Sequence, residues 1–211
     1  MAISAGTHLG SYEILGPLGS GGMGQVWRAR HRMLDRPAAI KLIRPESLGP
    51  EAGEQAKILL RRFEREAKAT AALRSPHTVQ VYDFGTTDDG AFYYVMELLE
   101  GCDLNSMVEQ HGPLPAARVI YILRQVCESL AEAHRNGLIH RDIKPSNIFL
   151  TDASFKYDFV KVLDFGLVKR APGSERKDSR LTVDGVVAGS PAFMAPELIK
   201  GAAPKDERVD I

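Results

Sequence analysis

Two short polar runs in the second half of the chain contain residue types that can carry out chemistry together. The first covers residues 140–147 (HRDIKPSN), and the second, after a short gap, covers residues 164–166 (DFG). Transfer of a phosphoryl group from ATP requires a carboxylate that orients the attacking hydroxyl, an amide oxygen and a second carboxylate for Mg²⁺, and a cation against the developing charge. Because the two runs supply all four residue types, we expect a phosphoryl-transfer site here.

The order of the two runs resembles the catalytic and metal-binding loops of protein kinases. The resemblance implies that Asp142 orients the substrate hydroxyl or accepts its proton, and that Lys144 contacts the γ-phosphate. It also implies that Asn147 and Asp164 bind Mg²⁺, with Mn²⁺ as the alternative ion, because hard oxygen donors suit such cations.

A glycine-rich stretch, residues 19–24, lies between two predicted strands. Glycines allow backbone N–H groups to close over phosphates without obstruction by side chains. A glycine-rich hairpin turn is the alternative, and a position between two strands is not typical of a dinucleotide-binding Rossmann unit. The stretch resembles the glycine-rich loop of protein kinases, which implies nucleotide contacts from Leu18, Gly19, Ser20, Gly21, Gly22, Gly24 and Val26.

Residues 38–41 (AAIK) resemble the kinase strand whose lysine holds the α- and β-phosphates of ATP, a role that falls to Lys41. The partner of that lysine should be a glutamate on the following helix. Glu66 is the first candidate because it lies near the apolar face, and Glu64 is the second. A surface pair between Glu66 and Arg62, four residues earlier, is the alternative.

The resemblance extends to the expected adenine site. Met96 falls at the gatekeeper position, and Glu97 and Leu99 would present backbone groups to the adenine edge. Asp103 falls where the family often has an acidic residue near the ribose hydroxyls, although an aspartate that starts a helix is equally explained as an N-cap. Three apolar positions match those that sandwich adenine, and each also suits the core: Val26, Ala39 and Phe149.

The hydrophobic pattern of the first half predicts mostly strands. Residues 12–43 alternate apolar and polar positions with glycine punctuation, which predicts three short antiparallel strands. Residues 58–73 show a helical pattern. Residues 79–84 and 91–96 predict two more strands across a turn.

The second half is predicted to be mainly helical. Residues 115–136 predict a helix that ends at Gly137. Residues 148–150 and 160–163 predict a small hairpin around a polar insertion at 151–158. One stripe of the helix is apolar: Val119, Ile122, Val126, Leu130 and Ala133.

Together these features predict an α+β, bilobal, protein-kinase-like fold. Its N-lobe would be an antiparallel β-sheet with one main helix, and its C-lobe would be partial and mainly helical. The predicted boundaries are an N-terminal leader (1–11) and a kinase domain (12–211) made of an N-lobe (12–97), a hinge (98–101) and a partial C-lobe (102–211).

Residues 208–211 (RVDI) resemble the opening of the central helix of the large kinase lobe, whose aspartate, here Asp210, tethers the backbone of the catalytic loop. The helices that follow in the family are absent from the sequence. We expect their absence to expose the apolar stripe of residues 115–136, and the segment alone to be poorly stable or inactive.

The substrate class follows from two further motifs. Residues 144–147 (KPSN) are similar to serine/threonine kinases, because tyrosine kinases usually lack a lysine at that point. Residues 189–197 (GSPAFMAPE) resemble the end of a kinase activation segment, with Ser190 beside the catalytic aspartate. The motifs most resemble bacterial protein kinases of the eukaryotic, or Hanks, type. A nucleotide-binding pseudokinase or truncated regulatory partner is the main alternative, and a small-molecule kinase is the third.

The expected partners are ATP, protein substrates with serine or threonine, and a second copy of the chain for autophosphorylation in trans. Thr182 is the first candidate site, because it lies seven residues before Gly189, and Ser179 is the second; an unmodified loop residue is the alternative. A phosphate on this loop can pair with Arg141. His140 and Phe165 are expected to pack beneath the loops rather than react.

Charge balance and cysteine spacing bear on the expected partners and location of the protein. Lys plus Arg equals Asp plus Glu at 27 each, which does not indicate nucleic acid as a partner. Cys102 and Cys127 follow no metal-ligand spacing, so buried, reduced thiols in a cytoplasmic protein are expected. We expect no secretory signal and no membrane span in this chain; an anchor beyond residue 211 in a longer protein stays open.

Overall fold

The computed structural model describes residues 3–21, 24–43, 64, 67–87, 89–153, 156–165, 191–199 and 206–211. The chain forms two compact units, and each is considered on its own. The first unit includes Met1–Ala71 and Gln80–Leu99, and the second includes Ala72–Val79 and the chain from Glu100 to Lys169 and from Gly173 to Ile211. The lobe boundaries given above stay predictions.

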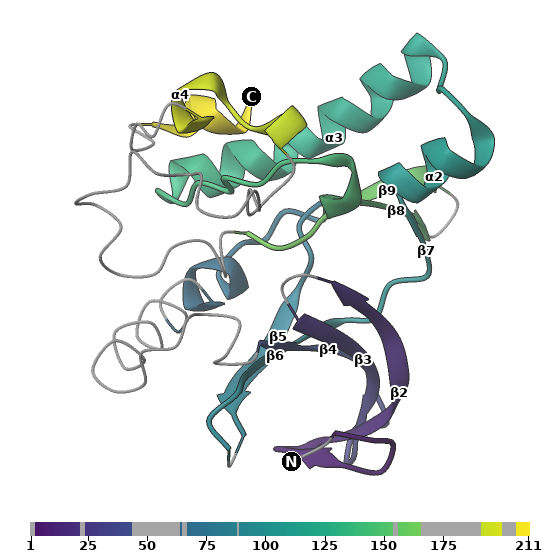
Figure 1. Ribbon diagram of the computed structural model, residues 1–211, viewed down its shortest axis with the longest axis vertical. Coiled ribbons are helices and arrows are strands. Elements are labelled where there is room, and N and C mark those ends of the chain that lie inside the picture. The colour runs from purple at the N-terminus through teal and green to yellow at the C-terminus, as the bar shows by residue number, and fades with distance from the viewer. Residues whose placement is uncertain are drawn as a thin grey trace, which may run out of the picture. The chain divides into compact units, whose positions relative to one another are not determined.

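The first unit contains a six-stranded antiparallel sheet in the order β1-β2-β3-β4-β6-β5, drawn as a curved sheet in Figure 1. One core is formed by buried side chains of these strands, which include Tyr12, Ile14, Ala29, Ile40 and Val95. Strand β4 is buried at every position after Pro37. The strands are β1 (His8–Leu9), β2 (Tyr12–Gly21), β3 (Gly24–His31), β4 (Pro37–Ile43), β5 (Val81–Thr86) and β6 (Phe92–Glu97).

The predicted strands of this unit are confirmed. Residues 12–43 form β2, β3 and β4, and the strands expected at 79–84 and 91–96 are β5 and β6, each shifted by one or two residues. The two-residue strand β1 was not expected, because its length leaves no periodic pattern to detect. Of the helix expected at 58–73, residues 67–71 are helical in the structure, and most of the rest lies outside the described residues.

The second unit combines helices with a three-stranded antiparallel sheet in the order β7-β8-β9. Strand β7 was not predicted because it is short, and α2 was anticipated only through Asp103 as a possible N-cap. The longer elements are β7 (Gly101–Asp103), α2 (Leu104–His111), α3 (Ala116–Arg135), β8 (Ile148–Ala153) and β9 (Lys156–Val162). The shorter helical turns are η2 (Pro145–Asn147), η3 (Pro191–Phe193), α4 (Pro196–Ile199) and η4 (Glu207–Asp210).

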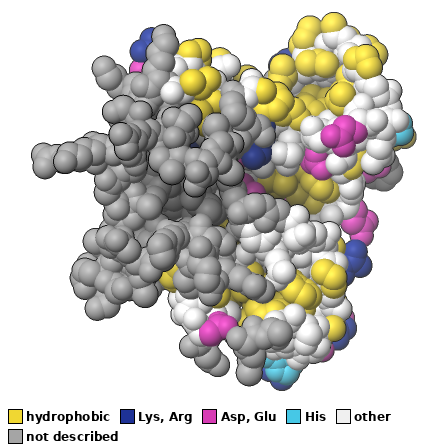
Figure 2. Space-filling view, in the orientation of Figure 1, with side chains coloured by type: hydrophobic (Ala, Val, Ile, Leu, Met, Phe, Trp, Pro, Cys, Tyr) yellow, Lys and Arg dark blue, Asp and Glu magenta, His cyan; other side chains and the backbone are white. Residues whose placement is uncertain are grey.

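The helix predicted at 115–136 is confirmed as α3. Its apolar stripe, which was expected to be exposed, is mostly buried. Four of the five stripe residues are buried against β8 and β9, and Val119 is 37% exposed. A different row, which includes Ile120 and Leu123, lies at the surface instead, and Figure 2 shows hydrophobic side chains gathered near the start of α3. The expectation of an exposed stripe was wrong because periodicity identifies an apolar face without identifying the element that covers it.

The predicted hairpin is confirmed, whereas the polar insertion expected at 151–158 is not a loop throughout. Strand β8 continues to Ala153, and β9 begins at Lys156. Thr151, Tyr157 and Phe159 favour extended backbone, and Thr151 pairs with Phe159 across the two strands.

Residues Ala72–Val79 are attached to the second unit although the chain on either side belongs to the first. Both carboxylate oxygens of Glu132 on α3 accept the Arg74 N–H, and one also accepts the Ser75 N–H at 2.6 Å. The Thr78 and Ser129 hydroxyls form a buried 2.6 Å hydrogen bond. The segment is therefore fixed by α3.

Among the described helices, none is both long and apolar enough to cross a membrane.

One glycine of the predicted phosphate loop is required by the sheet itself. Gly24 has φ = 134°, and a Cβ there would overlap the carbonyl oxygen of Leu42 on β4. We expect Gly24→Ala to reduce the free energy of unfolding by about 2 kcal/mol or more, because backbone cannot move aside cheaply.

Gly16→Ala in the same sheet is the matched control, since nothing lies within 4 Å of a Cβ at Gly16. Urea unfolding of the two variants makes the comparison. Equal stabilities for the two would contradict this account of Gly24.

Candidate active site

The catalytic loop predicted at 140–147 is held by one buried carboxylate. Asp210 accepts the His140 N–H at Oδ2 (2.8 Å) and the Arg141 N–H at Oδ1 (2.6 Å). Its Oδ2 also lies 2.8 Å from His134 Nε2, and its side chain is 0% exposed. The expectation that Asp210 tethers this loop is confirmed. His134 was missed, because one histidine on a helix carries no signal of a partner 76 residues away.

His140 links this loop to the residues that precede Asp164. Its ring is fully buried, with Nε2 2.7 Å from the Leu163 carbonyl and Nδ1 3.2 Å from the Asp142 N–H. Nδ1 can accept that N–H only when it carries no proton, which assigns the proton of the neutral ring to Nε2. Burial lowers the pKa of His140, which favours this neutral form. The ring also packs on Phe165 at 4.8 Å, so both residues lie beneath the loops as expected.

Three predicted catalytic side chains lie together in this loop. Asn147 Nδ2 donates to the Asp142 carbonyl oxygen (2.8 Å) and to Asp142 Oδ2 (3.2 Å). Lys144 Nζ lies 3.1 Å from the same Oδ2. Pro145 begins the turn η2, which carries the chain from the lysine to the asparagine. The loop therefore presents one carboxylate that is oriented by an amide and paired with a cation.

The donor set around Asn147 and Asp164 could hold a divalent cation. Because Asn147 uses Nδ2 for its two bonds to Asp142, its Oδ1 lone pairs can face a cation. The Leu163 N–H donates to the Asn147 carbonyl, which connects the two candidate ligands through backbone. Within the described ranges, no group of three or more His, Cys, Asp or Glu side chains could hold a metal. A site with two protein oxygens suits Mg²⁺ completed by phosphates and water.

The candidate phosphate and adenine contacts of the first unit lie along β2, β3, β4 and β6. Lys41 is 7% exposed on β4, in register with Val26 and Tyr94. Ala39 is buried, and Met96 is half-buried on β6. The candidates on β2, which were expected before the turn of the glycine-rich loop, are Leu18, Gly19, Ser20 and Gly21.

Two candidates already have partners within the fold. The Glu97 N–H donates to the Gln80 carbonyl, and the Gln80 N–H donates to Glu97 Oε1, so an adenine contact from Glu97 must use its carbonyl. Asp103 caps α2, with Oδ1 accepting the Ser106 N–H and Oδ2 accepting the Ser106 hydroxyl. The N-cap alternative is thereby confirmed. Phe149 is half-buried and lies opposite Asp103 in the sheet.

Some predicted site residues lie outside the described residues, so their placement stays a prediction. The fallback partner of Lys41, Glu64, is described and is half-buried. The undescribed candidates are Gly22, Glu66, Ser179, Thr182 and Ser190.

The antiparallel sheet of the first unit and the mainly helical second unit, with its tethered aspartate loop, are the two parts of a bilobal protein-kinase fold. The chain belongs to the protein kinase family, because the family model for the protein kinase domain matches residues 12–211.

Known relatives agree with this assignment. The chain is 40% identical over 200 residues to the serine/threonine-protein kinase pkn3 of Myxococcus xanthus, covering 95% of this chain and 35% of that protein. It is 37% identical over 196 residues to PknD of Mycobacterium tuberculosis, covering 93% and 27%. The chain thus spans about a third or less of the curated relatives it matches. The crystal structure of the Mycobacterium tuberculosis PknI kinase domain matches with a TM-score of 0.75 at 28% identity, over 99% of this chain and 73% of that one.

Removal of the Asp210 carboxylate tests the tether. Asp210→Ala leaves the His140 and Arg141 N–H groups without their acceptor, so we expect the free energy of unfolding to fall by about 3 kcal/mol or more. Phosphotransfer should fall at least about tenfold, because the loop that carries Asp142 loses its fixed backbone.

Asp206→Asn is the control for this change, since it removes a nearby half-buried carboxylate while asparagine can still cap η4. Urea unfolding and phosphate incorporation are measured for both variants. A D210A protein as stable and active as D206N would show that the tether is dispensable.

The neutral His140 predicts an acid sensitivity. Burial places its folded pKa below the usual value of about 6.5, so below that pH the unfolded chain binds a proton that the folded chain does not. Its contribution to stability is fully present above about pH 6.5 and is lost as the pH falls toward the folded pKa. The slope from this one group is at most about 1.4 kcal/mol per pH unit.

Urea unfolding between pH 7.5 and 5 checks this expectation. His140→Gln should show a shallower acid slope than wild type, and the exposed-site control His8→Gln should match wild type. Parallel pH dependences for H140Q and wild type would assign the acid sensitivity to other groups.

Proposed function

We propose that this chain is the nucleotide-binding and catalytic part of a protein serine/threonine kinase that transfers the γ-phosphoryl group of ATP to protein hydroxyls. One observation carries the proposal: Asp142 Oδ2 lies 3.1 Å from Lys144 Nζ and 3.2 Å from Asn147 Nδ2 within a single tethered loop. The names of pkn3 and PknD support the serine/threonine class.

In this proposal Asp142 orients the substrate hydroxyl and accepts its proton as the bond to phosphorus forms. General-base assistance of this kind contributes roughly 10²–10⁴-fold to a rate. Asn147 fixes the direction of the carboxylate. Lys144, already beside that carboxylate, contacts the γ-phosphate and stabilises the charge that develops on it.

Asn147 and Asp164 hold the divalent ion, for which we propose Mg²⁺, with Mn²⁺ as the alternative. Bound there, the ion neutralises phosphate charge and fixes the geometry of transfer. Lys41 holds the α- and β-phosphates with Glu66 as its partner, and the stretch from Leu18 to Val26 covers the phosphates. The adenine lies against Val26, Ala39, Met96 and Phe149, near the backbone of Glu97 and Leu99, with its ribose near Asp103.

Autophosphorylation in trans at Thr182 belongs to the same proposal. Arg141 supports it, because its Nε is buried and has no hydrogen-bond partner within the described part of the chain. A phosphate is a suitable acceptor for such a guanidinium. The two cysteines are free, but the expectation that both are buried was wrong, because Cys102 is half-buried and Cys127 is exposed. Use of ATP and free cysteines favour a cytoplasmic location for this part of the protein.

Asp142→Asn in the full-length protein tests the activity. We expect phosphate incorporation into serine and threonine peptides to fall at least about 10²-fold, because an amide cannot accept the proton, while ATP affinity changes less than about threefold. Tyrosine peptides should stay unlabelled by the wild type. A wild-type protein that binds ATP without phosphotransfer would favour the pseudokinase alternative.

Phosphopeptide mapping of the same reaction tests Thr182, and active protein with Thr182 unmodified would reject that site.

A further inference from the structure

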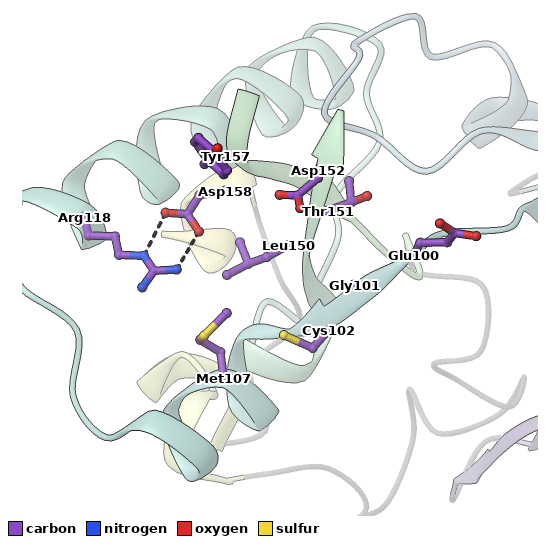
Figure 3. A pocket seen from close by; sticks show the side chains of 10 residues that line it. All are labelled: Glu100, Gly101, Cys102, Met107, Arg118, Leu150, Thr151, Asp152, Tyr157 and Asp158. Carbon is purple, nitrogen blue, oxygen red and sulfur yellow. Dashed lines mark hydrogen bonds and ion pairs between the residues drawn. The ribbon is translucent and has the colours of Figure 1, made fainter. Parts of the chain in front are cut away.

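The second unit contains a pocket of about 590 Å³ that takes no part in the proposed reaction. It lies among β7, α2, the start of α3 and the β8–β9 hairpin (Figure 3). Its lining includes none of the residues assigned above to ATP, the metal or catalysis.

The walls of this pocket are fixed by the fold. Gly101 has φ = 139°, and a Cβ there would overlap the Leu150 carbonyl oxygen, so β7 lies as close to β8 as only glycine allows. Arg118 donates to both carboxylate oxygens of Asp158, each at 2.7 Å, which joins α3 to β9. Gln125 adds a 2.9 Å bond to the Asp158 carbonyl. A preformed pocket loses little entropy when a ligand binds.

The pocket is acidic in a chain whose total formal charge is zero. Three carboxylates line it with one guanidinium, a local formal charge of −2. Arg118 donates to both carboxylate oxygens of Asp158, so its charge neutralises Asp158 and leaves Glu100 and Asp152 uncompensated. These two side chains are exposed and form no hydrogen bond or ion pair within the described ranges. Figure 3 shows both on the side of the pocket away from the Arg118–Asp158 pair.

An apolar wall adjoins these carboxylates. Met107 and Leu150 belong to or pack on the core of the second unit, and Figure 3 shows Met107, Leu150 and Cys102 around the same space. Methionine and cysteine adapt to side chains of different shapes. The pocket therefore offers an apolar surface for one side chain and negative charge for its neighbours.

We propose that this pocket docks a cationic peptide segment of a protein, with basic side chains at Glu100 and Asp152 and an aliphatic side chain against Met107 and Leu150. Charge complementarity selects this occupant over nucleotides, nucleic acids and acidic peptides. A metal ion does not fit, because the described residues provide no group of three suitable ligands and, unlike Asn147 and Asp164, this pocket has no ATP phosphates in the proposed reaction to complete the coordination. A role of this pocket in docking kinase substrates depends on the proposed kinase function. The binding of a cationic peptide by the pocket does not depend on it.

Fluorescence anisotropy with the full-length protein tests the proposal. The probe is a fluorescein-labelled peptide, Arg-Arg-Gly-Leu-Gly-amide. We expect Glu100→Gln with Asp152→Asn to weaken its binding roughly five- to thirty-fold, since two charged contacts are removed. Both positions are exposed, so the variant should fold as the wild type does. Asp35→Asn with Glu128→Gln removes the same charge outside the pocket and should leave the affinity within about twofold.

Two further peptides separate the charged and apolar contributions. Glu-Glu-Gly-Leu-Gly-amide should bind far more weakly than the arginine peptide, and Arg-Arg-Gly-Gly-Gly-amide should bind more weakly because it lacks the aliphatic side chain. Equal binding of the acidic peptide, or equal losses in the pocket and control variants, would overturn the proposal.

Phosphorylation of a short serine peptide without basic residues distinguishes the pocket from the kinase activity. The variant E100Q/D152N should phosphorylate this peptide at the wild-type rate. Peptide binding without any phosphotransfer would support the pocket and contradict the kinase function. Phosphotransfer without selective peptide binding would support the kinase function and contradict the proposal for the pocket.

Discussion

The contact between the Asp210 carboxylate and two adjacent backbone N–H groups holds the catalytic loop in a backbone conformation that it would not otherwise prefer. Arg141 has φ = 65°, a left-handed conformation that costs about 1–3 kcal/mol for a residue other than glycine. Hydrogen bonds to a charged acceptor contribute about 1.5–3 kcal/mol each, and Asp210 accepts from both His140 and Arg141. Together the two bonds contribute about 3–6 kcal/mol, which is more than the cost of the strain, so the tether can offset the strain and fix where Asp142 points.

Hydrogen bonds through His140 connect this contact to Asn147 and Leu163, next to the proposed metal ligands. The Asp142 N–H meets His140 Nδ1, and His140 Nε2 meets the Leu163 carbonyl. The Leu163 N–H then donates to the Asn147 carbonyl, which closes the path back to the loop. A charged His140 would lose the acceptor in the middle of this path, so its lowered pKa keeps the path intact. Asp142, Asn147 and the residue before Asp164 are therefore positioned by one hydrogen-bonded network.

Local patterns predicted the parts of this molecule that depend on local physics. Alternation located β2, β3 and β4, and helical periodicity located α3, because each pattern reflects the geometry of its own element. The spacing of Asp142 and Asn147 identified their loop. Periodicity did not reveal that β8 and β9 cover the apolar stripe of α3, nor that Glu132 binds residues 58 positions earlier in the chain. Such pairings depend on tertiary contacts, which a single sequence does not encode in any short window.

Some of the motif residues are required by the fold itself, and others are explained only by function. Gly24 is required by the close approach of Leu42, Asp103 by the N-terminus of α2, and the side chain of Glu97 by the Gln80 N–H, so each has a role within the fold. Lys41 differs from these. Every residue of β4 after Pro37 is buried, and an ammonium group at such a position is costly unless negative charge faces it. An apolar residue would satisfy the sheet at lower cost. The presence of lysine is therefore best explained by the proposed function, in which Glu66 and the phosphates of ATP face its ammonium group.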